Sequence, residues 1–242
     1  MNNLKSPIKT NQLNSLQIIV IVIAIIFIGL LIWLVVSIFS MSKQIHNINT
    51  EQHQTAGDVK EYLTATYTPE IQAIIEGENS PWIGSPNPQV TIVQFADFAC
   101  PYCRQTYSAL RQISIKYQNS VKIVFRDLPS YDDSIVLSLA AHCANEQDKF
   151  WAMHDKLYAQ QSTDLTTDAN NLLTIAKQIG LDVQELINCI DEKRYLDKIQ
   201  DSFIDAQSLG ATGTPTWFVN GQKIEGVVTL AEWENLLNQL IN

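Results

Sequence analysis

The hydrophobic positions of the chain begin with a long unbroken apolar run. Residues 18–36 are all apolar, and Ile38 and Phe39 extend the run past Ser37. At about 1.5 Å per residue in a helix, this segment spans a hydrocarbon core of roughly 30 Å. A secretory signal peptide has an apolar region of only about 7–15 residues and a small-residue cleavage site, which this run lacks. We therefore expect an uncleaved transmembrane helix over residues 18–39.

The positive residues around this run predict its orientation. Lys5 and Lys9 precede the run, whereas Lys43 is the nearest positive residue after it. Because the side with more Lys and Arg stays in the cytoplasm, residues 1–17 are expected to be cytoplasmic. Residues 40–80 are mostly polar and predict a spacer. The rest of a single-pass protein would then lie on the periplasmic side of a bacterial membrane, where disulfides form and persist.

Residues 81–242 change to alternating strand and helix patterns, which predict one α/β domain. The expected elements, in chain order, are a strand over 89–95, a helix from 100 to about 118, a strand over 121–126, helices within about 130–209, strands over 216–219 and 222–224, and a last helix from 229. The first three form a parallel strand–helix–strand unit. Asn220-Gly221 is a strong hairpin signal between the last two strands.

Composition excludes one class of function. The formal net charge is −9 and the isoelectric point is near 4.8, and no run of Lys or Arg is present. A nucleic-acid-binding protein needs a basic patch to contact phosphates, so nucleic acid is not an expected partner. No internal repeat and no glycine-rich phosphate-binding loop is present, and we expect no cofactor.

The chemistry of the chain is concentrated in Cys100-Pro101-Tyr102-Cys103, which follows the first strand directly and opens a helix. Thiols three positions apart on a helix share a face and can close a small disulfide. The first thiol lies at the helix N-terminus, where unpaired N–H groups and the macrodipole favour a negative sulfur. We therefore expect Cys100 to be the attacking thiolate and Cys103 the buried resolving thiol.

Other interpretations of the cysteines stay open at this point. A zinc site uses the same spacing but needs a second pair of ligands, which the sequence does not offer, so no metal is expected. Cys143 and Cys189 fall in expected helices and are either two buried free thiols or a structural disulfide. The even number of cysteines outside the cytoplasm favours the disulfide. His142 is interpreted as a helix-surface histidine and His154 as a hydrogen-bonded core histidine.

Four segments resemble the DsbA-like thiol:disulfide oxidoreductases of the thioredoxin superfamily. They are residues 95–103 (FADFACPYC), 125–129 (FRDLP), 149–155 (KFWAMHD) and 213–221 (GTPTWFVNG). The resemblance covers about residues 80–242. It implies a thioredoxin fold with an inserted helical domain at about 130–209. It also implies that Thr214 and Pro215 form a cis-proline loop against the Cys100 sulfur and bind the substrate.

The chain departs from this family at two places. Gln94 stands where the family often carries a glutamate thought to assist proton movement at the resolving cysteine, and a glutamine cannot accept that proton. Tyr102 replaces the histidine of the strongest oxidants, and a neutral phenol gives the Cys100 thiolate less electrostatic help. We therefore expect an oxidant weaker than about −120 mV, the value quoted for DsbA itself.

Together these features predict a membrane-tethered thiol:disulfide oxidoreductase. Its expected partners are substrate proteins with free thiols, a membrane redox partner that reoxidises it, and the lipid bilayer around residues 18–39. A chaperone or assembly factor that holds Cu(I) between Cys100 and Cys103 is the alternative, although the sequence has no Met or His ligand near the motif. A non-catalytic domain is disfavoured by the intact cysteines and proline loop.

Overall fold

The computed structural model describes residues 27–31, 33–37, 68–160 and 169–241. Residues 27–31 and 33–37 are helical, and the other residues of the expected 18–39 helix lie outside the described part, as do residues 1–17 and 40–67. Among the described residues, no helix has both the length and the apolar character needed to cross a membrane.

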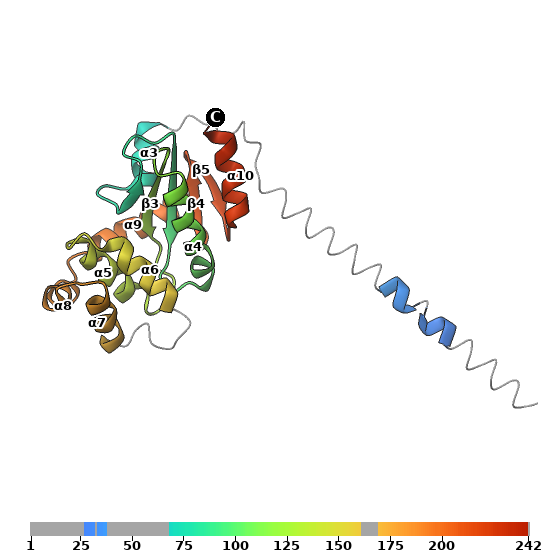
Figure 1. The fold of residues 1–242 in the computed structure, drawn as a ribbon, viewed down its shortest axis with the longest axis horizontal. Coiled ribbons are helices and arrows are strands. Elements are labelled where there is room, and N and C mark those ends of the chain that lie inside the picture. Colours follow the sequence, from blue (N-terminus) through green and yellow to red (C-terminus); the bar gives the residue numbers. More distant parts are fainter. Residues whose placement is uncertain (1–26, 32, 38–67, 161–168, 242) are drawn as a thin grey trace, which may run out of the picture. The chain divides into compact units, whose positions relative to one another are not determined.

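A mixed five-stranded sheet forms the centre of residues 68–241, in the order β1-β3-β2-β4-β5 (Figure 1). Its strands are β1 (Trp82–Gly84), β2 (Val90–Ala96), β3 (Val121–Asp127), β4 (Thr216–Val219) and β5 (Gln222–Glu225). β2 and β3 are parallel, whereas the other neighbouring pairs are antiparallel. The sequence did not predict β1, because three residues are too few to show an alternating pattern.

Helices cover both faces of the sheet. They are α3 (Pro69–Glu76), α4 (Pro101–Lys116), α5 (Ser134–Asn145), α6 (Phe150–Gln160), α7 (Ala169–Gln178), α8 (Val183–Asp191), α9 (Leu196–Ser208) and α10 (Leu230–Leu240). α4 and α10 pack on one face, where Leu110 and Trp233 join a buried cluster with Ile92. α3 and α9 pack on the other, where Ile75 and Ala206 join Val93, Phe95 and Phe218. Successive β2 residues thus serve opposite faces, as the period of a strand requires.

The expected helical insertion is present between β3 and β4. Helices α5 to α8 gather beyond one end of the sheet (Figure 1). They enclose a separate buried cluster that includes Leu137, Met153, Leu157 and Ile175. This cluster also contains Cys100 and Cys103, so the insertion packs directly against the end of the sheet that carries the thiols.

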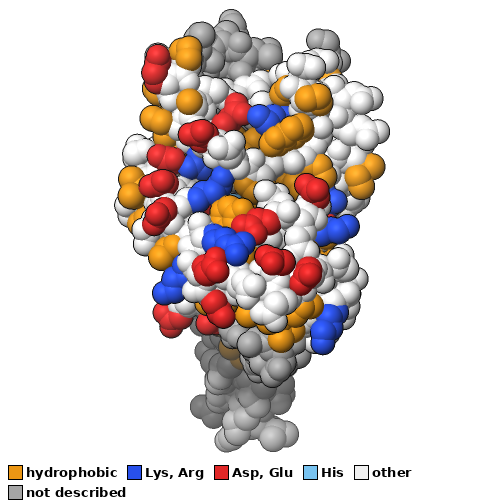
Figure 2. All heavy atoms as spheres, turned by 90° about the vertical axis from the view of Figure 1, so that its left-hand side faces the viewer, with side chains coloured by type: hydrophobic (Ala, Val, Ile, Leu, Met, Phe, Trp, Pro, Cys, Tyr) orange, Lys and Arg blue, Asp and Glu red, His pale blue; other side chains and the backbone are white. Residues whose placement is uncertain are grey.

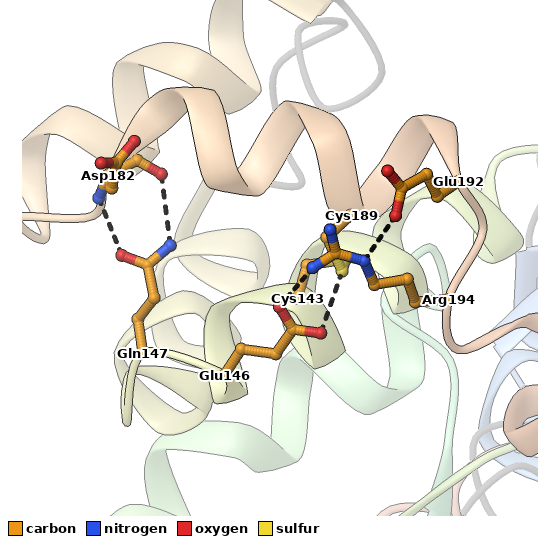
Figure 3. The surroundings of a disulfide bond; sticks show 7 residues. All are labelled: Cys143, Glu146, Gln147, Asp182, Cys189, Glu192 and Arg194. Atoms are coloured by element: carbon orange, nitrogen blue, oxygen red, sulfur yellow. Dashed lines mark hydrogen bonds and ion pairs between the residues drawn. A yellow bond between two sulfur atoms is a disulfide. The ribbon is translucent and has the colours of Figure 1, made fainter.

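A disulfide joins Cys143 of α5 to Cys189 of α8, which settles the alternative left open above. Both cysteines are buried. Figure 3 shows Arg194 beside this bond, where its guanidinium pairs with Glu146 at 2.9 Å and with Glu192 at 2.7 Å. The bond crosses 46 positions of sequence and ties two helices of the insertion together.

Figure 2 shows one face of the molecule, on which acidic and basic side chains are interspersed between small groups of apolar side chains. Neither sign of charge forms a continuous patch on this face. Ion pairs occur among the described residues, for example between Lys116 and Glu234 at 2.7 Å. Solvent-exposed pairs such as this one contribute little to stability, typically about 0–1 kcal/mol each.

Candidate active site

Cys100 and Cys103 lie where β2 gives way to α4. Cys100 is the N-cap of α4 with extended backbone angles, and Pro101 occupies the first helical turn, where its missing N–H costs nothing. Cys103 is one helical turn further on. Both thiols are free, and Cys100 is 2% and Cys103 0% exposed. Tyr102, between them, points outward and is 56% exposed.

The surroundings of Cys100 stabilise a thiolate. A hydrogen bond from the Cys103 thiol lowers the pKa of Cys100 to about 5. Hydrogen bonds from the Thr214 side chain and from the backbone N–H groups of Tyr102 and Cys103 act in the same direction and outweigh the effect of burial. These N–H groups are unpaired donors of the first helical turn, so the helix N-terminus itself provides part of the anion site.

Cys103 has the opposite tendency. Burial raises its pKa well above the usual value, and the negative charge on Cys100 raises it further. A thiol this deep in the protein stays protonated at neutral pH and does not act as the first nucleophile. The two sulfurs, although one turn apart, are thus chemically different.

The loop before β4 completes this arrangement. The Thr214–Pro215 peptide bond is cis, and the Cys100 thiol donates to the Thr214 carbonyl at 3.3 Å. β4 reaches this place because it pairs with β2, with Thr216 opposite Phe95. The sheet therefore brings residues 100 and 214 together across more than a hundred positions of sequence.

A family model described as thioredoxin matches residues 76–239, which cover the cysteine pair, the inserted helices and the cis-proline loop. The chain belongs to the thioredoxin family.

Solved structures share this thioredoxin-family fold. A thioredoxin-like oxidoreductase from Silicibacter pomeroyi is 27% identical, with a TM-score of 0.61 over 72% of this chain and 97% of that one. The thiol-disulfide exchange protein α-DsbA2 from Wolbachia pipientis is 22% identical, with a TM-score of 0.63 over 75% and 95%. BdbD from Bacillus subtilis is 23% identical, with a TM-score of 0.58 over 67% and 94%.

Curated relatives match over a smaller part of their own length. A Na(+)/H(+) antiporter NhaA 3 of Salinispora tropica is 37% identical over 140 residues, which are 57% of this chain and 21% of that protein. An antiporter NhaA of Herminiimonas arsenicoxydans is 25% identical over 217 residues, 90% of this chain and 32% of that one. The thioredoxin-family chain thus spans between about a fifth and a third of these relatives.

Asp97 organises the turn that leads to Cys100, a role that sequence reasoning missed. Its Oδ1 accepts from the Ala99 N–H at 2.8 Å, and its Oδ2 accepts from the Ser130 N–H and the Ser134 hydroxyl, both at 2.7 Å. Its own carbonyl accepts from the Cys100 N–H at 3.1 Å. Burial raises the pKa of Asp97 despite these hydrogen bonds. The Asp97 carboxyl therefore connects the turn after β3, at Ser130, to the turn that leads to Cys100.

Gln94 is fully buried on β2, between Phe125 of β3 and Trp217 of β4. It shares the sheet face of Ile92, which packs towards α4 and therefore towards the helix of Cys103. Neither atom of its amide hydrogen-bonds to any residue in the described part of the chain. The place of the family glutamate is thus taken by an unpaired amide.

The interpretation of His142 as a surface histidine is wrong. It is 1% exposed, and its Nε2 lies 2.6 Å from Asp127 Oδ2 at the end of β3. Burial alone would raise the pKa of Asp127, but the charge and hydrogen bond of His142 hold it below its usual value. Every residue of α5 from Leu137 to Ala144 is buried, so spacing along the helix does not separate a surface side from a core side at His142.

The interpretation of His154 as a core histidine is correct only in part. The ring is fully buried among aromatic side chains, and Nδ1 lies 2.9 Å from Asp155 Oδ1. Its Nε2 has no hydrogen-bond partner among the described residues. Burial lowers the pKa of His154, which favours the neutral ring.

Proposed function

We propose that this thioredoxin-family protein is a membrane-tethered thiol:disulfide oxidoreductase that forms or exchanges disulfides in extracytoplasmic proteins. The pair of unlike thiols carries the proposal: a thiolate at Cys100 beside a protonated, buried Cys103. The apolar run over residues 18–39 and the excess of Lys before it support the tether and its orientation.

The reaction starts from the disulfide form of the Cys100–Cys103 pair. A substrate thiolate attacks the Cys100 sulfur, the Cys100–Cys103 bond breaks, and Cys103 leaves with the electron pair and takes up a proton. A second substrate thiolate then attacks the substrate sulfur of this mixed disulfide and releases Cys100 as a thiolate. The substrate loses two electrons in forming its disulfide, and the enzyme gains them as two thiols.

The low pKa of Cys100 favours the oxidising direction. A stabilised thiolate lowers the free energy of the reduced enzyme, so the enzyme disulfide is readily reduced and is passed to substrates. A membrane redox partner would then withdraw the two electrons and restore the disulfide. Because the protein and this partner would be anchored in the same bilayer, they would encounter each other by diffusing within the plane of the membrane.

The equilibrium of the Cys100–Cys103 pair with glutathione buffers tests this function. We expect a potential between about −270 mV, typical of a reducing thioredoxin, and about −120 mV, typical of DsbA. Cys100→Ser should abolish exchange, and Cys103→Ser should accumulate mixed disulfides. The double variant Cys143→Ala/Cys189→Ala, which leaves the pair intact, is the control and should keep exchanging. A potential below −270 mV in the same assay would contradict the oxidising assignment.

A further inference from the structure

The side chain of Tyr158 brings a hydroxyl group into the interior of the protein. This residue is fully buried on α6, one turn after His154 and on the same side of that helix. The rings of Phe98, Tyr107 and His154 surround it, with centroids 5.1, 5.7 and 4.9 Å from its own. A phenylalanine would fill the same space without burying a hydroxyl, and a buried hydroxyl is costly unless it forms a hydrogen bond.

The hydrogen bond of this hydroxyl leads to the active-site turn. The Tyr158 hydroxyl donates to the main-chain carbonyl of Asp97 at 3.2 Å. The Cys100 N–H donates to the same carbonyl oxygen at 3.1 Å. One acceptor therefore connects the helical insertion to the backbone of the reactive cysteine, although Tyr158 and Asp97 are 61 positions apart in the chain.

The phenol also lies within electrostatic reach of both thiols. Burial raises the pKa of Tyr158 well above its ordinary value, and negative charges on Cys103, Asp97 and Cys100 raise it further. The hydroxyl therefore stays protonated at neutral pH and remains a donor. Because charge interactions act in both directions, the dipole of this hydroxyl also acts on the charge of the sulfurs.

The contact favours the reduced form of the enzyme over the disulfide form. A carbonyl oxygen carries partial negative charge, and that of Asp97 lies at the N–H of the residue whose sulfur becomes a thiolate. A donated hydrogen bond offsets part of this charge and fixes the turn, so that the first-turn N–H groups of α4 keep their direction towards the sulfur. The disulfide form has no charge on Cys100 and gains less from the same contact.

We propose that Tyr158 is a positioning residue for thiol–disulfide exchange: through the Asp97 carbonyl, its hydroxyl holds the turn before Cys100 in the conformation that favours the thiolate. Tyr158 acts through Asp97, whereas Thr214 accepts directly from the Cys100 thiol at 3.3 Å. The proposal rests on the proposed function, because only an exchange reaction uses the Cys100 thiolate. A phenylalanine at position 158 would keep the aromatic packing and lose the effect on the thiolate.

The ultraviolet absorbance of the thiolate measures this effect. The full chain, reconstituted in lipid nanodiscs and reduced, is titrated with acid, and the wild type should lose half of the thiolate absorbance near pH 5. Tyr158→Phe should raise this midpoint by about one pH unit, the change expected from the loss of one hydrogen bond. At neutral pH the equilibrium constant for oxidation of glutathione by the enzyme should then fall about tenfold, which corresponds to about 30 mV.

Tyr107→Phe is the matched control. The ring of Tyr107, on α4, stacks on that of Tyr158, so this substitution removes a hydroxyl from the same aromatic cluster and leaves the donor to Asp97 in place. Its titration midpoint and its equilibrium with glutathione should equal those of the wild type. A second measurement needs no variant: the nuclear magnetic resonance signal of an isotope-labelled tyrosine at position 158 should shift with a midpoint near pH 5 in the reduced protein and stay constant there in the oxidised protein.

Three outcomes would overturn the role of Tyr158. They are an unchanged or lowered midpoint in Tyr158→Phe, an equal rise in Tyr158→Phe and Tyr107→Phe, and a Tyr158 signal that does not respond to the titration of the reduced protein. Failure of the proposed function is a different result, because the wild type itself would then not exchange with glutathione.

Discussion

At the scale of single residues, two cysteines one helical turn apart have opposite acidities because their surroundings differ. Cys100 lies at the N-cap of α4, where first-turn N–H groups, Thr214 and the Cys103 thiol all donate towards its sulfur. Cys103 points into the core and receives no comparable stabilisation, so burial dominates. Burial raises the pKa of a thiol, whereas hydrogen bonds to the thiolate lower it. The hydrogen bonds prevail at Cys100 and burial prevails at Cys103.

Alkylation of the reduced protein measures this difference. The rate at which iodoacetamide labels Cys100 should rise with pH and reach half its maximum near pH 5, because only the thiolate reacts and its pKa is about 5. Cys103 should remain unlabelled at neutral pH. Mass spectrometry of peptides after timed quenching identifies the labelled residue. Faster labelling of Cys103 than of Cys100 would reverse the two roles.

A second prediction concerns the unpaired amide of Gln94. Because neither amide atom has a hydrogen-bond partner among the described residues, Gln94→Met should leave the folded protein as stable or stabilise it by about 1 kcal/mol. Urea unfolding of the oxidised protein measures the change. Thr106→Val is the matched control, because Thr106 is equally buried but donates to the Cys103 carbonyl at 2.9 Å, and its loss should destabilise. A large destabilisation in Gln94→Met would show that the amide is paired.

At the scale of elements, α5 connects three features that are remote in sequence. Its first residue, Ser134, donates to Asp97 beside the thiolate. His142, two turns on, pairs with Asp127 at the end of β3, and Cys143 next to it is bonded to Cys189 of α8. One helix therefore positions the active-site turn, the sheet and the insertion relative to one another.

The His142–Asp127 pair should be necessary for stability. His142→Phe leaves the buried carboxylate of Asp127 without its partner and should lower the free energy of unfolding by about 3 kcal/mol at pH 7. The double variant Asp127→Asn/His142→Phe removes the charge as well and should recover part of that loss. Urea unfolding at pH 7 compares the variants. Equal stability of the single variant and the wild type would refute a structural role for the pair.

At the scale of the whole molecule, the proposal joins an acidic α/β domain to an apolar N-terminal run. The domain has the thiol pair, and the run over residues 18–39 is long enough for a helix that crosses the bilayer. A tethered enzyme would stay close to the membrane partner that reoxidises it and would meet its substrates as they emerge.

A fusion reporter tests this topology. A cysteine-free reporter that is active only outside the cytoplasm, fused after Asn242, should be active in the intact cell. The control replaces Ser40, Ser42 and Gln44 by Lys, which reverses the excess of positive charge across the run and should reduce that activity. A wild-type fusion that is produced in full but carries an inactive reporter would contradict both the orientation and the oxidative role.

Local sequence signals determined much of this protein. The apolar stretch over 89–95, the helix after Cys100 and the hairpin at Asn220-Gly221 all depend on residues that are neighbours in the chain, and the structure contains each of them. The family resemblance added the inserted helices and the cis bond before Pro215, both of which are present. The position of Cys100 at a helix N-terminus was itself enough to indicate its low pKa.

Only the tertiary structure decided which distant side chains meet. Asp97 binds Ser130 and Ser134 because β2 and β3 are parallel neighbours and end at the same edge of the sheet. His142 faces Asp127 because α5 packs against that same edge, and periodicity cannot reveal which side of the helix meets a carboxylate where residues 137–144 are all buried. The pairing of Cys143 with Cys189 likewise depends on how α5 and α8 pack, which is set by the fit of whole surfaces rather than by spacing along the chain.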